Sequence, residues 1–170
     1  VGYTNAGKST LLNALTDAGV LVEDRLFATL DTRTKRWSPA KGAQVLISDT
    51  VGFIKNLPHQ LVASFKATLE EAINADLLLH IIDVSNADAL KQIESVNTVL
   101  EEIGCGGKPI LMLLNKVDCL QSLSQLEMLQ TLFSDAIAIS AKTGFGLDNL
   151  AEKVAEAYKG TEILVRVSSS

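Results

Sequence analysis

A cluster of small, basic and hydroxyl residues stands at the start of the chain, in the order Gly2, Tyr3, Thr4, Asn5, Ala6, Gly7, Lys8, Ser9, Thr10. The stretch matches the phosphate-binding pattern G-x-x-x-x-G-K-[ST] at every fixed position. Glycine at both ends lets the backbone wrap closely around a dense negative group, because a residue without Cβ can adopt positive φ values. Successive backbone N–H groups then form an anion-binding nest. The pattern therefore predicts a loop that binds the phosphates of a nucleotide.

Lys8 and Ser9 supply the charge and the metal ligand of this loop. A helix that begins near Lys8 points the positive end of its dipole at the phosphates, and the lysine reaches the β- and γ-phosphates as a cation. The Ser9 hydroxyl is placed to bind Mg²⁺. The alternative is an accidental glycine-rich turn, which average residue usage would produce in about one chain of this length in a hundred.

A D-x-x-G element follows as Asp49, Thr50, Val51 and Gly52. Two fixed positions in four are weak by themselves, but a carboxylate that ends a strand beside a phosphate loop can hold Mg²⁺ through a water molecule. The Gly52 N–H can bond to a γ-phosphate and so sense its presence. The alternative is a turn capped by Asp49.

The N-K-x-D element Asn115, Lys116, Val117, Asp118 indicates which base is bound. The Asp118 carboxylate can accept two hydrogen bonds from N1–H and the exocyclic amine of guanine, whereas adenine offers an acceptor at N1 and no amine at C2. Adenine would leave a charged group unpaired, so the motif selects GTP over ATP by on the order of 10⁴. We expect Asn115 to tie this loop to the phosphate loop and the Lys116 stem to lie along the base.

A turn of Ser140, Ala141 and Lys142 completes the set, with backbone amides that would meet the guanine oxygen. This tripeptide is weak evidence alone and gains weight from its place in the order of motifs.

The elements that position these motifs follow from apolar periodicity. We expect helices over 9–17, 59–73, 88–103, 123–133 and 147–158, and strands over 77–84, 109–114, 136–139 and 161–167. Residues 36–39 and 44–49 should form a hairpin turned at 40–42. His80, inside the apolar run 77–84, is expected to be a core residue with satisfied hydrogen bonds rather than a catalyst. Alternating strands and helices predict an α/β P-loop NTPase fold, a doubly wound, mostly parallel sheet with helices on both faces.

Composition indicates one globular domain, with 47% hydrophobic and 21% charged residues in 170. A net charge of −5 and a pI near 5.0 argue against a broad basic face for nucleic acid. Two cysteines without CxxC spacing indicate reduced thiols, and no apolar run reaches the ~18 residues of a membrane span. We expect a cytoplasmic monomer.

The chain opens on Val1 with its phosphate loop beginning at the next residue. We therefore expect residues 1–160 to be a nucleotide-binding domain whose first strand is truncated. Residues 161–170 should form a strand or linker towards a missing or short C-terminal segment.

The order of these motifs resembles the translation-factor class of small GTPases, and within it the HflX family of the Obg–HflX group. The resemblance rests on residues 2–11, 26–31, 49–59, 65–70 and 75–80. It implies that the switch segment Phe27, Ala28, Thr29, Leu30, Asp31 contacts the nucleotide, with Thr29 joining Ser9 on Mg²⁺. Thr32 stands where the family usually has Pro, which should loosen the backbone without removing a ligand.

The resemblance also implies a catalytic set and a rate. Lys8, Thr29 and Gly52 would act on the γ-phosphate, and Asn5 is a candidate contact for K⁺. Because Phe53 follows Gly52 where Ras-like proteins have a water-orienting Gln, we expect slow intrinsic hydrolysis, accelerated by K⁺ or by a partner.

The implied function is a GTP-hydrolysing switch that binds the large ribosomal subunit and splits stalled or idle ribosomes. One alternative is a GTP-dependent binding module with negligible turnover, and another is a different GTPase of ribosome assembly or tRNA modification. The resemblance also implies that much of the ribosome contact comes from an N-terminal domain outside this sequence. Arg33, Lys35 and Arg36 could touch RNA, although a solvated hairpin face is the simpler interpretation.

Overall fold

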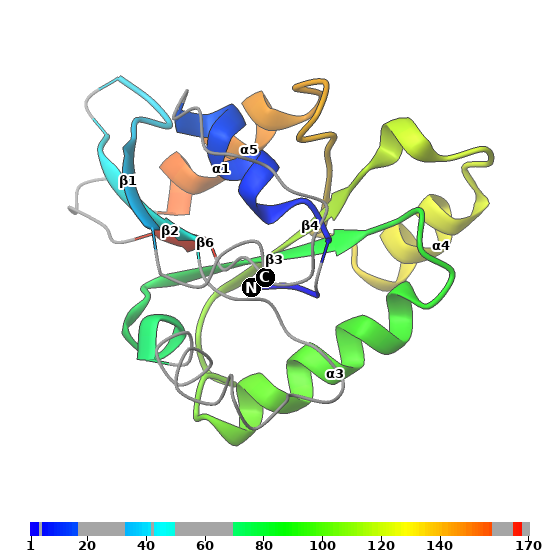
Figure 1. Cartoon of the computed structure of the whole chain (residues 1–170), viewed down its shortest axis with the longest axis horizontal. Helices are drawn as coiled ribbons and strands as arrows, with labels where there is room; N and C mark the ends of the chain where they lie inside the picture. Colours follow the sequence, from blue (N-terminus) through cyan, green and yellow to red (C-terminus); the bar gives the residue numbers. More distant parts are fainter. Residues whose placement is uncertain (4, 17–32, 42, 50–69, 158–164, 168–170) are drawn as a thin grey trace.

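A four-stranded parallel sheet forms the centre of the described part of the chain (Figure 1). The structure is a computed structural model that describes residues 1–3, 5–16, 33–41, 43–49, 70–157 and 165–167. The strand order is β5-β4-β3-β6, and all three pairings are parallel. The strands are β3 Leu77–Asp83, β4 Ile110–Asn115, β5 Ile137–Ala138 and β6 Val165–Val167.

Strand β3 is one of the two central strands of this sheet and is buried along all but its last residue, Asp83. Its run of Leu and Ile has no polar face because helices cover both sides, as is typical of parallel sheets. His80 is buried as expected, and desolvation lowers its pKa to about 3, which keeps the imidazole neutral. The expectation that its hydrogen bonds are satisfied is not met at Nδ1, which has no partner among the described residues.

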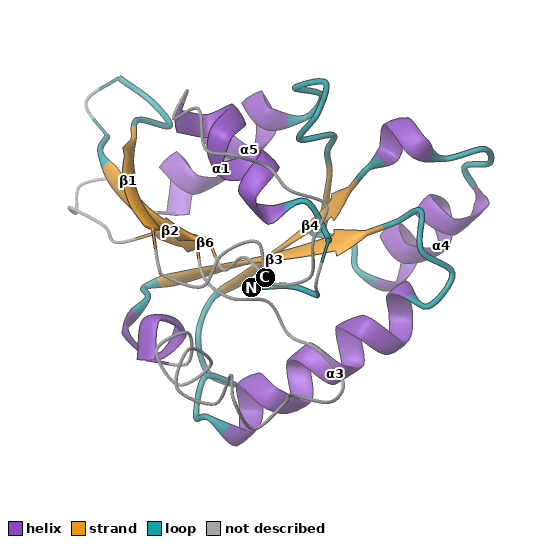
Figure 2. Cartoon of the chain, in the orientation of Figure 1, coloured by secondary structure: helices purple, strands orange, loops and turns teal. Residues whose placement is uncertain are grey.

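Helices lie on both faces of the sheet, which confirms the predicted architecture (Figure 2). On one face, α1 (Lys8–Thr16) and α5 (Leu147–Ala157) pack through Leu11, Leu12, Leu150 and Val154 onto odd-numbered residues of β3. On the other, α3 (Ala89–Glu102) packs onto even-numbered β3 residues, with α4 (Ser124–Leu132) beside it. Removing such side chains from water stabilises the fold by about 1.5–3 kcal/mol each.

The expected hairpin is present as β1 (Arg33–Trp37) and β2 (Val45–Asp49), paired antiparallel. Its first strand begins three residues before the predicted start at Arg36. The added residues are polar and give no apolar alternation, but the hydroxyls of Thr34 and Ser48 lie 2.7 Å apart across the strands. Cross-strand bonding therefore extends the pairing where hydrophobic patterning does not show it.

Other elements match their expected places, with ends shifted by one or two residues. Residues 70–74 are helical, so the helix expected to end at 73 reaches 74, and its remainder lies outside the described residues. The strand expected within 161–167 is β6. A short 3₁₀ helix, η2 (Val117–Cys119), was not predicted. Among the described helices, none combines the length and apolar character needed to cross a lipid bilayer.

Candidate nucleotide site

The start of the phosphate loop is anchored on β3. Gly2 forms a parallel bridge with Ile81, and the Ile81 N–H donates a hydrogen bond of 2.8 Å to the Val1 carbonyl oxygen. A Cβ on Gly2 would lie 2.4 Å from the Ile81 carbonyl oxygen, a contact that real side chains do not make. The first glycine of the motif is therefore required by close approach of two backbones.

The second glycine is required for two reasons. Gly7 has φ of +95°, which lies in the region that favours glycine. A Cβ at this position would also lie 2.4 Å from Nδ2 of Asn115. The Leu11 N–H donates to the Gly7 carbonyl oxygen at 2.9 Å, so the loop turns directly into the first turn of α1.

Asn115 joins three of the predicted motifs. Its Nδ2 donates to the Ala6 carbonyl oxygen at 2.7 Å, and its Oδ1 accepts from the Ala141 N–H at 2.9 Å. The side chain is 1% exposed, so both bonds form away from water. The expected contact between Asn115 and the phosphate loop is confirmed, and the bond to Ala141 connects the S-A-K turn to the same residue.

Lys8 lies at the N-terminus of α1 and is 2% exposed. Its Nζ donates to the carbonyl oxygens of Gly2 and Tyr3, which places the amine inside the curve of the loop. Burial lowers the pKa of this amine to about 7, helped by the positive charge of Lys116 and opposed by Asp49. An ammonium held this way gains most from an incoming anion, because a phosphate would supply the charge that the site lacks.

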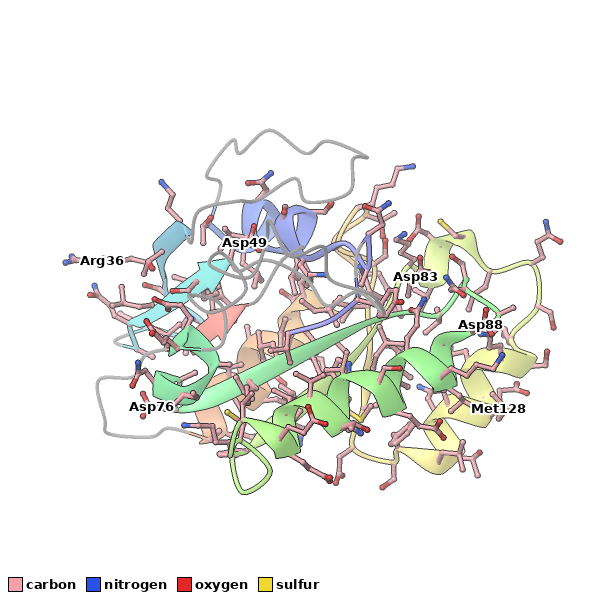
Figure 3. The ribbon with its side chains drawn as sticks, turned by 60° about the horizontal axis from the view of Figure 1, so that its bottom comes forward. Arg36, Asp49, Asp76, Asp83, Asp88 and Met128 are labelled. Carbon is pink, nitrogen blue, oxygen red and sulfur yellow. The ribbon has the colours of Figure 1, made fainter. Side chains whose placement is uncertain are left out.

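The Ser9 hydroxyl donates to Oδ2 of Asp49 at 3.0 Å, so two of the three predicted Mg²⁺ residues are adjacent. Both are buried, and Asp49 ends β2 beside α1 (Figure 3). A hydroxyl and a carboxylate oxygen are hard ligands that suit Mg²⁺, which binds through one or two protein oxygens together with phosphates and waters. In the described part of the chain, no group of three or more His, Cys, Asp or Glu side chains could hold a metal ion.

Asp118 and the S-A-K turn form the predicted base-recognition side. Ser140 Oγ donates to Asp118 Oδ1 at 2.6 Å and accepts from the Thr143 N–H at 3.1 Å. The hydrogen bond from Ser140 holds the pKa of the Asp118 carboxyl below its usual value, with desolvation opposing it and Lys142 assisting. Asp118 is exposed and ionised, and so is open to a ligand.

Sequence reasoning missed Asp83 as part of this site. Its Oδ2 lies 2.6 Å from Nζ of Lys116, and the two side chains are 15% and 31% exposed. A signal was available, because Asp83 ends β3 in register with Asn115 at the end of β4. Carboxyl ends of neighbouring parallel strands share one edge of a sheet, so a polar residue there is a candidate partner.

Several predicted site residues lie outside the described residues, and their roles stay predictions. They are Thr4, Phe27, Ala28, Thr29, Leu30, Asp31, Thr50, Val51 and Gly52. Asn5 is described and has a positive φ of 60°. The basic residues Lys35 and Arg36 are exposed on β1.

A glycine-rich loop that opens a helix at the carboxyl ends of parallel strands, with a lysine inside the loop, defines the P-loop class of nucleotide-binding domains. The sequence profile of the family described as "50S ribosome-binding GTPase" matches residues 1–116. The GTPase HflX of Magnetococcus marinus is 51% identical over 172 residues, which cover 99% of this chain and 40% of that protein. The GTPase HflX of Escherichia coli K12 is 45% identical over 161 residues, which cover 94% of this chain and 38% of that protein.

Solved structures agree with the class. A GTP-binding protein of Sulfolobus solfataricus in complex with GDP superposes with a TM-score of 0.72 at 34% identity, covering 91% of this chain and 50% of that one. Aquifex aeolicus Era bound to GDP and AlF4⁻ superposes with a TM-score of 0.74 over 95% of this chain and 56% of that one, and at 24% identity it shows the shared fold alone. The chain belongs to the family described as "50S ribosome-binding GTPase", and within it to the HflX group. It spans about two fifths of the length of the curated relatives it matches.

Proposed function

We propose that this chain binds GTP and GDP, hydrolyses GTP to GDP and phosphate, and acts as a switch on the large ribosomal subunit. The observation that carries the proposal is that Asn115 donates a hydrogen bond to the Ala6 carbonyl oxygen and accepts one from the Ala141 N–H. These bonds hold the phosphate loop, the N-K-x-D loop and the S-A-K turn together. Because these contacts exist within the chain itself, phosphate binding and base reading occur in one preorganised site.

On the phosphate side, Lys8 would exchange its bonds to the Gly2 and Tyr3 carbonyl oxygens for bonds to β- and γ-phosphate oxygens. Ser9 and Asp49 would hold Mg²⁺, with Thr29 as the further ligand in the GTP state. When bound, Mg²⁺ neutralises charge on the phosphate oxygens. Lys8 and the N–H groups of the loop stabilise the charge that develops on the γ-phosphate during its transfer to water.

On the base side, Asp118 would accept two hydrogen bonds from guanine, while Ala141 and its neighbours present backbone N–H groups to the guanine oxygen. Adenine cannot satisfy the carboxylate, and an unpaired charge there costs several kcal/mol. The site therefore selects guanine over adenine through the hydrogen bonds that adenine cannot make, rather than through the size of the base.

The proposed hydrolysis is slow in isolation, since Phe53 stands where a Gln would orient the attacking water. A partner or K⁺ at Asn5 would then accelerate the reaction. Phe53 also supports a second candidate function, a module that binds its partner in the GTP state and hydrolyses GTP too slowly for turnover to matter.

Binding to the large ribosomal subunit is proposed from the relatives, which are named GTPase HflX, and from the description of the family. The proposal places the protein in the cytoplasm as a monomer. Since this chain corresponds to about two fifths of those relatives, regions outside it would contribute to ribosome contact.

The test is GTP hydrolysis by this chain in K⁺ and in Na⁺ buffers, with and without large ribosomal subunits, using Lys8→Ala as the inactive control. The proposal expects low basal turnover that rises with K⁺ and with subunits. Binding of GTP without turnover under all four conditions would favour the binding module, and fast turnover indifferent to K⁺ and subunits would contradict the switch.

A further inference from the structure

The ion pair between Asp83 and Lys116 is partly buried, unlike the exposed Lys91–Asp88 and Lys153–Glu156 pairs. The side chains of Asp83 and Lys116 are 15% and 31% exposed, whereas those of Lys91 and Asp88 are 80% and 62% exposed. Exposed pairs contribute about 0–1 kcal/mol, because water competes for both charges. Partial burial strengthens the attraction at Asp83 and makes loss of either partner more costly.

The Asp83 carboxylate is held in one orientation by its own loop. Its Oδ1 accepts hydrogen bonds from the Ser85 N–H at 2.9 Å and the Ser85 hydroxyl at 2.5 Å, which leaves Oδ2 for Lys116. The Val84 N–H donates to the Asn115 carbonyl oxygen at 3.0 Å, so the two strand ends are also joined through backbone. Asp83 is therefore a fixed acceptor at the end of β3, where Figure 3 labels it.

Lys116 reaches this acceptor by passing the phosphate loop. Its backbone has φ of 67°, an uncommon value for a residue with a side chain. Its Cε lies 4.0 Å from the position that a Cβ on Gly7 would occupy. The methylene stem thus passes Gly7 while the charge is bound at the end of β3.

We propose that Asp83 is a positioning residue for nucleotide binding, which acts by holding the Lys116 side chain extended across the phosphate loop. This inference rests on the proposed guanine-nucleotide site. A stem fixed in advance forms an apolar wall for the nucleoside without losing rotamer freedom on binding. Without Asp83, the Lys116 side chain is free to turn into solvent. When it stays in place, its positive charge lies near that of Lys8 with no partner to balance it.

The test compares Asp83→Asn, Lys116→Met and the double variant by the dissociation rate of a fluorescent GDP. Asparagine can still accept from Ser85 but presents no charge to Lys116, and methionine keeps most of the stem. Asp83→Asn should accelerate dissociation by about tenfold, as expected for loss of a partly buried charge partner. The double variant should be no faster than the faster single variant, because both act through one contact.

The control is Asp88→Asn, which removes the exposed pair with Lys91 at the start of α3 and should leave dissociation unchanged. A second readout separates positioning from a loss of folding. Asp83→Asn should weaken GDP and IDP by the same factor, since the stem reads no group on the base edge, and the melting temperature should fall no more than that of Lys116→Met.

Failure of this inference can be distinguished from failure of the proposed site. If the unaltered chain does not bind the fluorescent GDP, the proposed site is wrong and the inference with it. If the unaltered chain binds but Asp83→Asn dissociates within twofold of it, or if the two substitutions act additively, Asp83 is not a positioning residue.

Discussion

The side-chain amide of Asn115 donates a hydrogen bond of 2.7 Å to the carbonyl oxygen of Ala6, between residues separated by 109 positions in the sequence. The partner atom is backbone, so the contact fixes the course of the phosphate loop whichever side chain stands at position 6. The other end of the amide bonds to Ala141, which makes Asn115 the common support of three loops.

Asn115→Ala should therefore weaken both the fold and nucleotide binding. Two buried hydrogen bonds are lost and the Ala6 and Ala141 groups are left unpaired, which costs about 2–4 kcal/mol. Thermal unfolding and calorimetric titration with GDP measure the two effects, and we expect affinity to fall by about 30-fold or more. Asn149→Ala, at an exposed position of α5, is the matched control and should change neither. Unchanged GDP affinity in Asn115→Ala would contradict the account of the site.

Gly7→Ala should distort the phosphate loop and so lower the affinity for GDP. The new Cβ would meet Asn115 Nδ2 at 2.4 Å, and the backbone has φ of +95°. Displacing Asn115 breaks the same bonds as above, and a positive φ adds about 1 kcal/mol or more of strain. Gly107→Ala is the control, because a Cβ there meets nothing within 4 Å. Comparable GDP affinities in the two variants would show that the loop does not need its second glycine.

The lowered pKa of Lys8 predicts a pH dependence of stability in the ligand-free chain. The amine has a pKa of about 7 when folded and 10.5 as the ordinary value, so between these values the unfolded state binds more protons. The free energy of unfolding should therefore rise with pH across this window. Urea unfolding at several pH values measures it, with Lys8→Met as the control that should lack this part of the rise. An equal rise in both proteins would remove Lys8 as the cause.

The same pKa predicts that nucleotide binding takes up a proton above pH 7. Phosphate favours the charged amine, so binding at pH 8.5 must protonate Lys8, and GDP affinity should fall as pH rises. Calorimetric titration in two buffers of different ionisation enthalpy measures the uptake directly. Binding without proton uptake at pH 8.5 would mean that the amine is already charged in the free chain.

Ser9→Ala should separate nucleotide binding from Mg²⁺ dependence. Ser9 donates to Asp49 at 3.0 Å, and its hydroxyl is the predicted direct ligand of the ion. In the variant, we expect added Mg²⁺ to improve GDP affinity much less than the factor measured for the unaltered chain. Titration with GDP in Mg²⁺ and in EDTA gives both factors, and Ser95→Ala, at an exposed position of α3, is the control. Equal Mg²⁺ effects in Ser9→Ala and the unaltered chain would exclude the hydroxyl as a ligand.

The sequence was most informative where chemistry requires a residue type. Gly2, Gly7 and Asn115 could be recognised because close backbone approach, positive φ and a two-ended amide each admit few alternatives. Apolar runs likewise predicted β3, which is buried along all but its last residue, and β4, which is buried over its last three residues.

Contacts between polar residues were harder to foresee. Asp83 carries no motif, and its role emerges only when the parallel register sets it beside Asn115. The start of β1 was missed because its pairing depends on the hydroxyls of Thr34 and Ser48 rather than on apolar alternation. His80 was expected to be an ordinary core residue, and no pattern in the sequence shows that its Nδ1 lacks a partner among the described residues.

The central claim is that this site reads guanine through Asp118, and one binding experiment tests it most directly. The unaltered chain and Asp118→Asn are titrated with GDP, XDP and ADP in Mg²⁺. An asparagine offers a donor where the carboxylate offered an acceptor, which matches the oxygen of xanthine in place of the guanine amine. We predict that the unaltered chain prefers GDP to ADP by on the order of 10³ or more and that the variant prefers XDP. Similar affinities for GDP and ADP in the unaltered chain would contradict the account.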